Sequence, residues 1–232
     1  MKTKTISIFL FIILAFSFNS KAQNIKQVEN FKKIKKTIDT LAVLPSLVEV
    51  IVIDVNDKTF NDTTCETKIS KSITKEINNL LTDKYTIISK ENQTKYSDGV
   101  VSDIEKLLNE LQNSKKRISN IEIGDSLLRL TDDKNRYYTI CIFSGVYKTS
   151  QRIKHDKREI LPKSIAVGLI SLGTISLKPA ISQYSIFKTI VFDRESKKVL
   201  FYSQAYGNEV HPKNTSMIKD FIMKCYKKIY YK

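Results

Sequence analysis

The sequence predicts an α/β fold, with a single mixed β-sheet of about five strands and helices packed on it. Three observations support this. Segments rich in β-branched and aromatic residues alternate along the chain with amphipathic helical stretches. An early strand–helix–strand order requires a parallel or mixed sheet. Finally, residues 184–207 contain two such β-rich runs around a short charged interruption, a pattern typical of a hairpin.

Residues 1–22 have the three-part layout of a secretory signal peptide. Lys2 and Lys4 precede an apolar run over residues 6–18, and Ser20 and Ala22 are the small residues before a predicted cleavage point. The alternative is a membrane anchor, but the run is shorter than the roughly 20 apolar residues of a spanning helix. The sequence therefore predicts export to a periplasmic or outer-membrane-associated location, or secretion from the cell.

The chain carries a formal net charge of +15, and removal of the predicted signal leaves 36 basic and 24 acidic residues, a net charge of +12. Such a balance fits nucleic acid, an anionic membrane or an acidic polymer. Only six basic residues are arginine, which nucleic-acid readers favour for bidentate contacts. We therefore expect solvated lysine-rich faces and no nucleic-acid partner.

Three cysteines, Cys65, Cys141 and Cys225, lie far apart in the sequence. Their odd number and long spacings argue against a disulfide scaffold, and no metal-binding spacing such as C-x-x-C occurs. Each lies on an apolar stripe, where a cysteine behaves as a small hydrophobic residue. One buried disulfide in an oxidising compartment remains an alternative.

The first segment of the mature chain, residues 23–38, is a basic N-terminal arm. Its apolar residues, from Ile25 to Ile38, recur at steps of three and four with lysines between them. This spacing predicts a helix, either an arm lying on a membrane surface or an ordinary linker helix with a solvated face.

Residues 41–55 predict a buried strand that is interrupted at Pro45, because proline cannot donate to a β-ladder. Residues 61–64 offer helix caps, and an apolar stripe predicts a helix to about Leu81. Residues 85–89 then form a second strand. These three elements make up the strand–helix–strand unit.

The second half of the domain also alternates predicted helices and strands. A clean apolar stripe predicts a helix from about Asp98, and a further helical segment follows Gly124. Residues 136–147 predict a third strand, in which Gly145 marks a bulge or a close approach of the backbone. The hairpin at 184–207 leads to a last helix that begins after caps at residues 214–216. One domain, residues 39–232, contains all of these elements.

An apolar excursion at residues 151–178 interrupts this pattern. Residues 151–163 are strongly charged, and the fourteen residues 164–177 are uncharged. As a helix the uncharged part would span about 21 Å, too short for a bilayer, and as β-structure it could cross one only within a closed barrel. It either packs on its own domain or forms a contact surface. The candidate interaction surface comprises Arg152, Lys154, Lys157, Arg158, Lys163, Ile165, Val167, Leu169, Ile170, Leu172, Ile175 and Leu177.

No catalytic, cofactor-binding or metal-binding set stands out in the sequence. His155 lies in the charged run, and His211 precedes a proline at a helix entry. Neither has a partner at ligand spacing. Adjacent carboxylates occur at Asp132 and Asp133, which we expect in a loop. The sequence therefore predicts a protein without a cofactor that is not an enzyme, and it indicates no small-molecule substrate.

Two motifs carry a resemblance to a known family. Residues 42–45 read A-V-L-P, and residues 193–200 match the pattern D-x-x-T/S-G-x-V/I-L except that Lys197 replaces the glycine. With the element order, these motifs resemble the TolB amino-terminal domain-like fold, and more closely the periplasmic domain of curli-assembly and related outer-membrane-biogenesis lipoproteins. The lipidation cysteine of those lipoproteins is missing here. A left-handed backbone at Lys197 would cost about 1 kcal/mol.

The resemblance implies a non-enzymatic cell-envelope protein that binds or assembles with another protein at the periplasmic face of an outer membrane. In channel-forming relatives a membrane-crossing hairpin lies between sheet strands, where residues 164–177 lie here, although these lack strict alternation. The alternatives are therefore a subunit of an oligomeric export channel and, as a third reading, an enzyme with a site assembled from scattered residues. A protein partner or self-association is expected, with peripheral membrane contact as a further option.

Overall fold

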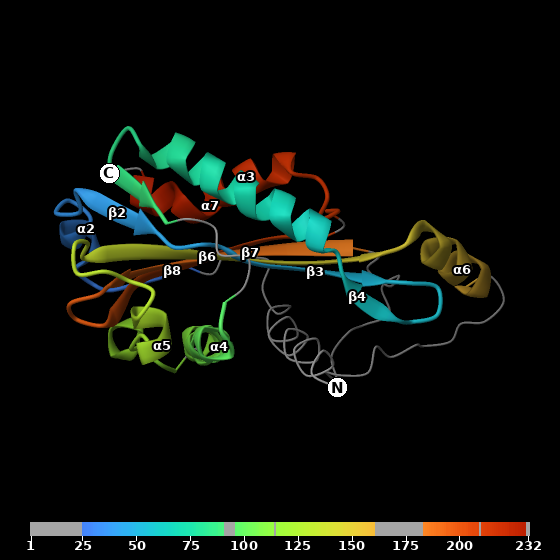
Figure 1. Cartoon of the computed structure of the whole chain (residues 1–232), viewed down its shortest axis with the longest axis horizontal. Helices are drawn as coiled ribbons and strands as arrows, with labels where there is room; N and C mark the ends of the chain where they lie inside the picture. Colours follow the sequence, from blue (N-terminus) through green and yellow to red (C-terminus); the bar gives the residue numbers. More distant parts are fainter. Residues whose placement is uncertain (1–24, 91–95, 114, 161–182, 209, 231–232) are drawn as a thin grey trace.

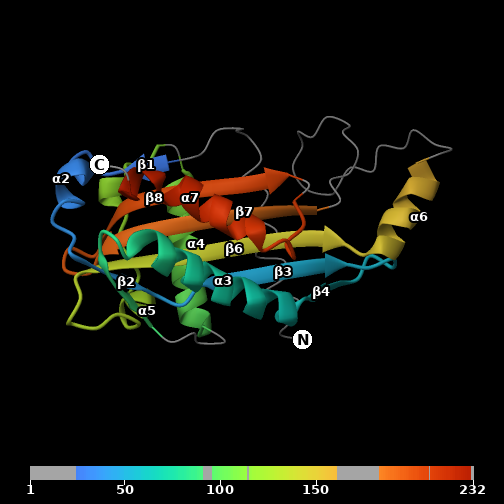
Figure 2. The ribbon, with the colours of Figure 1, turned by 90° about the horizontal axis from the view of Figure 1, so that it is seen from above.

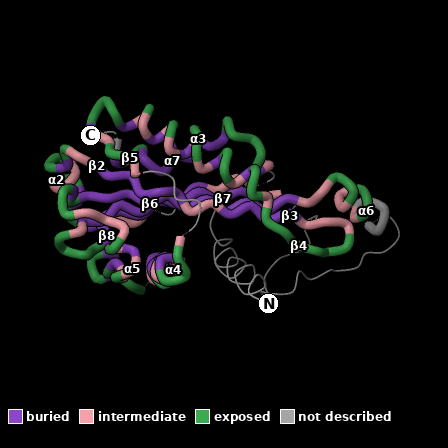
Figure 3. Tube along the Cα trace, in the orientation of Figure 1, coloured by how far each residue is buried: buried purple, intermediate pink, exposed green. Residues whose placement is uncertain are grey.

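The computed structural model describes residues 25–90, 96–113, 115–160, 183–208 and 210–230, with the backbone alone at 157–160, 208, 228 and 230. The predicted signal peptide and residues 161–182 lie outside this part of the chain. The predicted fold class is confirmed, since one mixed sheet carries helices on both faces (Figure 1). The buried residues concentrate in the sheet (Figure 3).

The sheet has eight strands in place of the five expected. The predicted strand at 41–55 is two strands separated at Pro45, and two short edge strands were not predicted. The order is β1-β8-β7-β6-β2-β5, with β3 beside β6 and β4 beside β3. The strands are β1 (Ile25–Gln27), β2 (Thr40–Val43), β3 (Leu47–Ile53), β4 (Thr59–Asn61), β5 (Thr86–Ser89), β6 (Tyr137–Lys148), β7 (Gln183–Asp193) and β8 (Lys198–Asn208).

Strand β6 is the centre of the sheet. On one side it pairs antiparallel with β7 over eleven residue pairs, from Tyr137↔Asp193 to Tyr147↔Gln183. On the other side it pairs in parallel with β2 and then with β3. The break at Pro45 lets these two strands follow one another along β6. The predicted strand–helix–strand unit is confirmed, because β2 and β5 are parallel.

Helices cover both faces of the sheet. Figure 1 shows α3 (Thr63–Leu81) and α7 (Ser216–Tyr230) on one face, and α4 (Asp98–Gln112) and α5 (Asp125–Leu128) on the other. Asp62 caps α3, where its Oδ1 accepts a hydrogen bond from the Cys65 amide at 3.0 Å. The predicted apolar stripes of α3, α4 and α7 are buried. A short 3₁₀ helix, η1 (Ile118–Asn120), follows α4.

The single helix predicted within residues 25–38 is wrong. The chain forms β1, which pairs antiparallel with β8, and then the one-turn helix α2 (Phe31–Ile34). The Phe31 ring stacks on Phe201 with centroids 5.2 Å apart, and Val28 and Ile38 are also buried in the core. Pairing with the open edge of β8 and burial of the apolar side chains override the helical periodicity.

The hairpin predicted at 184–207 is confirmed as β7 and β8, with a register shift between Val191 and Phe192. Lys197 ends the turn with φ 55°, so the left-handed position predicted there is also confirmed. A lysine pays a steric cost of roughly 1 kcal/mol in that conformation. An ion pair with Asp125 at 3.8 Å and a backbone bond to Ile123 accompany it.

Candidate functional site

The described part of the predicted interaction surface lies on α6 (Ser150–Ile160). This helix follows β6 directly and projects beyond the end of the sheet, away from the other helices (Figures 1 and 2). Lys154 and His155 are exposed on it. Lys157 and Arg158 belong to the same helix, but only their backbone is described. Lys163, Ile165, Val167, Leu169, Ile170, Leu172, Ile175 and Leu177 lie outside the described residues.

Arg152 lies at the base of α6, and its side chain is only 17% exposed. Its Nε lies 2.7 Å from Asp156 Oδ1, and its Nη1 lies 2.9 Å from Asp57 Oδ1. Nη1 also donates to the Val55 carbonyl at 3.3 Å. Lys148 completes the network with an ion pair to Asp156 at 2.6 Å. Arg152 therefore ties α6 to the β3–β4 turn, whereas the sequence suggested a residue that faces a partner.

A second polar cluster surrounds His211. The Tyr147 hydroxyl donates to Asp62 Oδ2 at 2.7 Å, and Lys213 Nζ lies 3.2 Å from the same oxygen. The His211 ring packs on the Tyr147 ring at 4.4 Å, and its Nδ1 accepts a hydrogen bond from the Lys213 amide at 3.1 Å. The cluster joins β6, the start of α3 and the segment before α7.

Electrostatics fix the protonation states in this cluster. Burial raises the pKa of Asp62, but hydrogen bonds from Tyr147, the Cys65 amide and Lys213 outweigh it, so the net pKa lies below the usual value. Burial and then the charge of Lys213 lower the pKa of His211. A neutral imidazole, a carboxylate and an ammonium therefore lie together at neutral pH. The sequence does not indicate this cluster, because its members come from three distant segments.

Gly145 allows the segment that contains His211 to lie close to β6. A Cβ atom there would lie 2.6 Å from Pro212 Cγ, so only glycine lets the residue after His211 pack on β6. The close approach predicted at Gly145 is confirmed. The His-Pro pair and this glycine are the sequence signals that could have indicated the contact.

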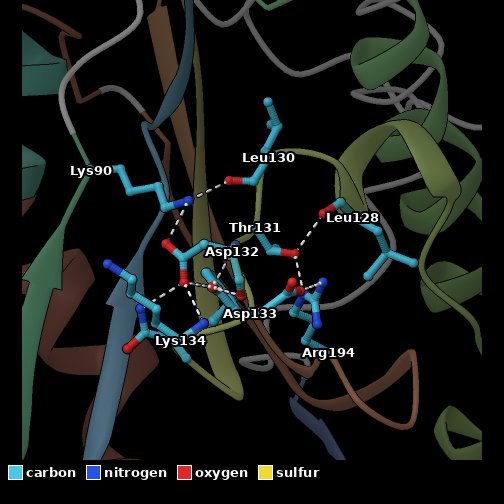
Figure 4. Close-up of polar contacts among 10 residues, drawn as sticks. Lys90, Leu128, Leu130, Thr131, Asp132, Asp133, Lys134 and Arg194 are labelled. Carbon is cyan, nitrogen blue, oxygen red and sulfur yellow. Dashed lines mark hydrogen bonds and ion pairs between the residues drawn. The ribbon is translucent and has the colours of Figure 1, made fainter.

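Asp132 is the centre of a third cluster, in the loop before β6 (Figure 4). Its carboxylate lies 3.1 Å from Lys90 Nζ and accepts hydrogen bonds from the Tyr138 hydroxyl at 2.9 Å and the Asn135 amide at 3.0 Å. The Lys90 contact is the main reason that the pKa of Asp132 is far below its usual range. Asp133, in turn, pairs with Arg194.

The predicted loop position of these two aspartates is confirmed. Each is bound by a different cation, so they do not form an acid–base pair. Lys90 also donates to the Leu130 carbonyl at 2.7 Å, and Arg194 Nε donates to Thr131 Oγ1 at 2.9 Å (Figure 4). The cluster therefore holds this loop against Lys90, which directly follows β5, and against Arg194 in the turn of the hairpin.

A fourth group lies on the sheet face opposite α3 and α7. Lys188 is 1% exposed, and its Nζ has no hydrogen-bond partner among the described residues. The strand register places Lys188 beside Ile142 of β6 and Gln204 of β8, and two residue pairs further along β6 it aligns Glu49 with Ser144, on the same face. Within the described part of the chain, both carboxylate oxygens of Glu49 also lack a partner at hydrogen-bond distance and angle, although the Asn61 side chain lies near them.

Burial shifts both ionisable groups of this face toward their neutral forms. It lowers the pKa of Lys188 from 10.5 to about 7. Burial, together with the charge of Glu66, raises the pKa of Glu49 from 4.5 to about 7, and Asn61 opposes the shift. An unpartnered buried lysine and carboxylate on one face are uncommon in folded proteins.

Within the described residues, no group of three or more His, Cys, Asp and Glu side chains could hold a metal ion. The three cysteines are free and buried, so the alternative of a disulfide is not realised. Burial raises the pKa of Cys65 to about 11 and that of Cys141 to about 12, which keeps both thiols protonated. No described helix combines the length and apolar character needed to cross a membrane.

Comparisons with known proteins give no family for this chain. No family model matches it. No curated protein matches it either. Among solved structures, it is similar to PelC from Paraburkholderia phytofirmans, determined as a dodecamer, with 6% identity over 84% of this chain and 90% of that chain. The TM-score of 0.33 is too low for this likeness to carry an argument.

Proposed function

We propose that the protein is an exported cell-envelope protein that binds another protein through a surface centred on α6. One observation carries this proposal. α6 lies beyond the end of the sheet, apart from the layers that form the core (Figure 2). A helix that serves only the core would pack its apolar side on the sheet, as α3, α4 and α7 do.

The base of α6 is held firmly enough to present such a surface. Arg152, Lys148, Asp156 and Asp57 form a connected set of ion pairs, and the first three side chains are less than one-fifth exposed. A partly buried network of this kind resists screening better than single surface pairs. A binding surface on a fixed element loses less conformational entropy when a partner docks.

The charge of α6 indicates the chemistry of the partner. Lys154 is exposed on it, and the sequence adds Lys157 and Arg158. Of the two acidic residues of α6, Asp156 and Glu159, Asp156 is already bound to Arg152 and Lys148, so the basic residues remain in excess. A partner with an acidic surface would therefore be attracted to this end of the molecule. The export part of the proposal rests on the signal-like pattern of residues 1–22.

Site-specific crosslinking tests the surface. A photoreactive residue in place of Lys154 should capture one defined envelope protein in cells, and Lys154→Glu should weaken the same complex. A photoreactive residue in place of Lys219, which is exposed on α7, is the matched control. The proposal fails if position 154 gives no product or the same products as position 219.

Two further measurements complete the test. Light scattering on the purified mature protein separates binding of another protein from self-association, because an oligomer would identify the captured partner as a second copy. Mass spectrometry of the protein from the envelope fraction should give a chain that begins at Gln23. A chain that begins at Met1 would contradict export through cleavage of the signal.

A further inference from the structure

A groove of about 970 Å³ lies at the end of the molecule opposite α6, beside α2 (Figure 1). It is bordered by β1, α2, η1 and the turn between β7 and β8. This volume is within the range of small-molecule sites. Part of its lining is apolar: Ile25 and Ile34 are half-buried, whereas Val28, Ile118 and Leu200 belong to the buried core.

Three basic side chains line the same groove: Lys26, Arg117 and Lys198. Arg117 and Lys198 are exposed, and neither forms an ion pair among the described contacts. Glu122 lies opposite Lys198 in an isolated β-bridge but is not part of the lining. Lys26 Nζ donates to the Asn113 carbonyl at 2.9 Å, and burial lowers its pKa.

The acidic residues of the lining do not balance these cations. Asp193 is held by Arg136, whose Nε and Nη2 donate to its two carboxylate oxygens at 3.1 and 2.9 Å. Its charge is therefore already compensated. Glu29 is the other acidic residue of the lining. The groove thus combines an apolar wall with an excess of positive charge.

We propose that this groove binds an organic anion with an apolar body, such as a carboxylate or phosphate joined to an acyl chain. Arg117 and Lys198 would bind the anionic group, because charge-assisted hydrogen bonds from these side chains are strong. The half-buried side chains of Ile25 and Ile34 would cover the apolar body. The described lining contains no aromatic side chain on which a nucleic-acid base could stack.

This site is independent of the proposed α6 surface, since the two lie at opposite ends of the sheet (Figure 1). Loss of the crosslink at Lys154 would leave it untouched. The sequence indicated no small molecule here, because the borders come from residues 25–34, 117–119 and 193–200. Only the fold brings these three segments together.

Calorimetry on the full mature chain tests the groove with three probes. Octyl phosphate carries both the anion and the chain, octanol lacks the anion, and inorganic phosphate lacks the chain. We expect octyl phosphate, used below its micelle concentration, to bind at least about tenfold more tightly than either of the others. Equal binding of octanol, or of inorganic phosphate, would overturn the proposal.

A pair of double variants separates the groove from general attraction to a basic protein. Arg117→Glu with Lys198→Glu should weaken octyl phosphate binding at least about tenfold. Lys219→Glu with Lys227→Glu makes the same charge change at exposed positions of α7 and should leave binding within about twofold. Equal losses in both variants would also overturn the proposal. Far-UV circular dichroism checks that each variant is folded.

Discussion

Two groups of buried polar side chains, one on each face of the sheet, differ in how completely they are hydrogen-bonded. Beneath α7, the Tyr226 hydroxyl hydrogen-bonds with Thr139 Oγ1 at 2.7 Å and accepts from Thr189 Oγ1 at 2.8 Å. Lys188 is the neighbour of Thr189 in β7 and points to the other face. It is just as buried, yet among the residues that the structure describes its Nζ has no hydrogen-bond partner, and neither do the carboxylate oxygens of Glu49 on that face.

The effect of burying a polar side chain on the stability of the fold depends on whether its polar atoms keep hydrogen-bond partners. The network around Tyr226 fixes one position of α7 on the sheet. Its burial costs little free energy, since each of its polar atoms keeps a partner. An unpartnered lysine or carboxylate destabilises the fold by its lost hydration. Costs of this kind usually persist at sites that serve a purpose other than stability. Three substitutions measure how far the two faces differ.

The largest effect is expected in the hydrogen-bonded group beneath α7, from Tyr226→Ala. The side chain is fully buried, so its removal leaves a cavity, and the hydroxyls of Thr139 and Thr189 lose the Tyr226 hydroxyl and keep their weaker contact with each other at 3.3 Å. The free energy of unfolding should fall by about 3–5 kcal/mol, as measured by urea titration. Tyr226→Phe, which keeps the ring, should lose only about 1 kcal/mol. Equal losses from both variants would show that the ring contributes nothing and that the hydroxyl network alone holds α7.

An effect of opposite sign is expected on the other face, from Lys188→Met. The pKa of Lys188 is about 7 in the folded chain and 10.5 as its ordinary value. Between these values the unfolded chain binds a proton that the folded chain lacks, so stability rises with pH across the window. Below pH 7 the Lys188 side chain is charged in the folded chain, and its burial then destabilises the fold by the full amount. Lys188→Met should therefore raise the free energy of unfolding by about 1–4 kcal/mol at pH 7.

Urea titrations of both proteins at pH 7 and pH 10 check this, and the advantage of the variant should shrink at the higher pH. Lys219→Met, at an exposed position, should change stability by less than about 0.5 kcal/mol at either pH. A loss of stability in Lys188→Met at pH 7 would mean that the lysine has a favourable partner, and the contrast between the faces would disappear.

The smallest effect is expected from Glu49→Gln. The pKa of Glu49 is raised from 4.5 to about 7, so between these values the folded chain holds a proton that the unfolded chain has lost. Stability then falls as pH rises through the window, and the cost is complete above pH 7. The variant should gain roughly 1–3 kcal/mol at pH 8 and nothing near pH 4, by thermal or urea unfolding. Glu122→Gln is the exposed control, and a gain that is independent of pH would refute the assignment.

Most of the fold could be predicted because its long elements carry strong local patterns. The stripes of α3, α4 and α7 and the runs of β6, β7 and β8 each fill several turns or alternations. Short edge strands have no such signal. β1 and β4 have three residues each and form only because β8 and β3 offer open edges. The helical spacing of residues 25–38 predicted the wrong structure for the same reason, because the pairing of β1 with β8 depends on a distant strand.

The polar clusters were harder to predict because distant segments build them. Asp132 and Asp133 were visible as a pair, but Lys90 and Arg194, which bind them, are about 40 and 60 residues away. Arg152 looked like part of a charged surface because its partner Asp57 precedes it by 95 positions. Lys188 did leave a signal, since it is a single charge inside the apolar run 184–192. A lysine at the centre of a buried strand requires an explanation in its own right.

The attachment of α6 has a mechanical consequence. A pull on this helix enters β6 directly through the chain, and it enters β3 through the contacts of Arg152 with Asp57 and the Val55 carbonyl. β3 and β6 run in parallel over seven residue pairs. A load along the strands is therefore shared as shear by many hydrogen bonds at once, so tension would reach the body of the domain before the helix could peel away.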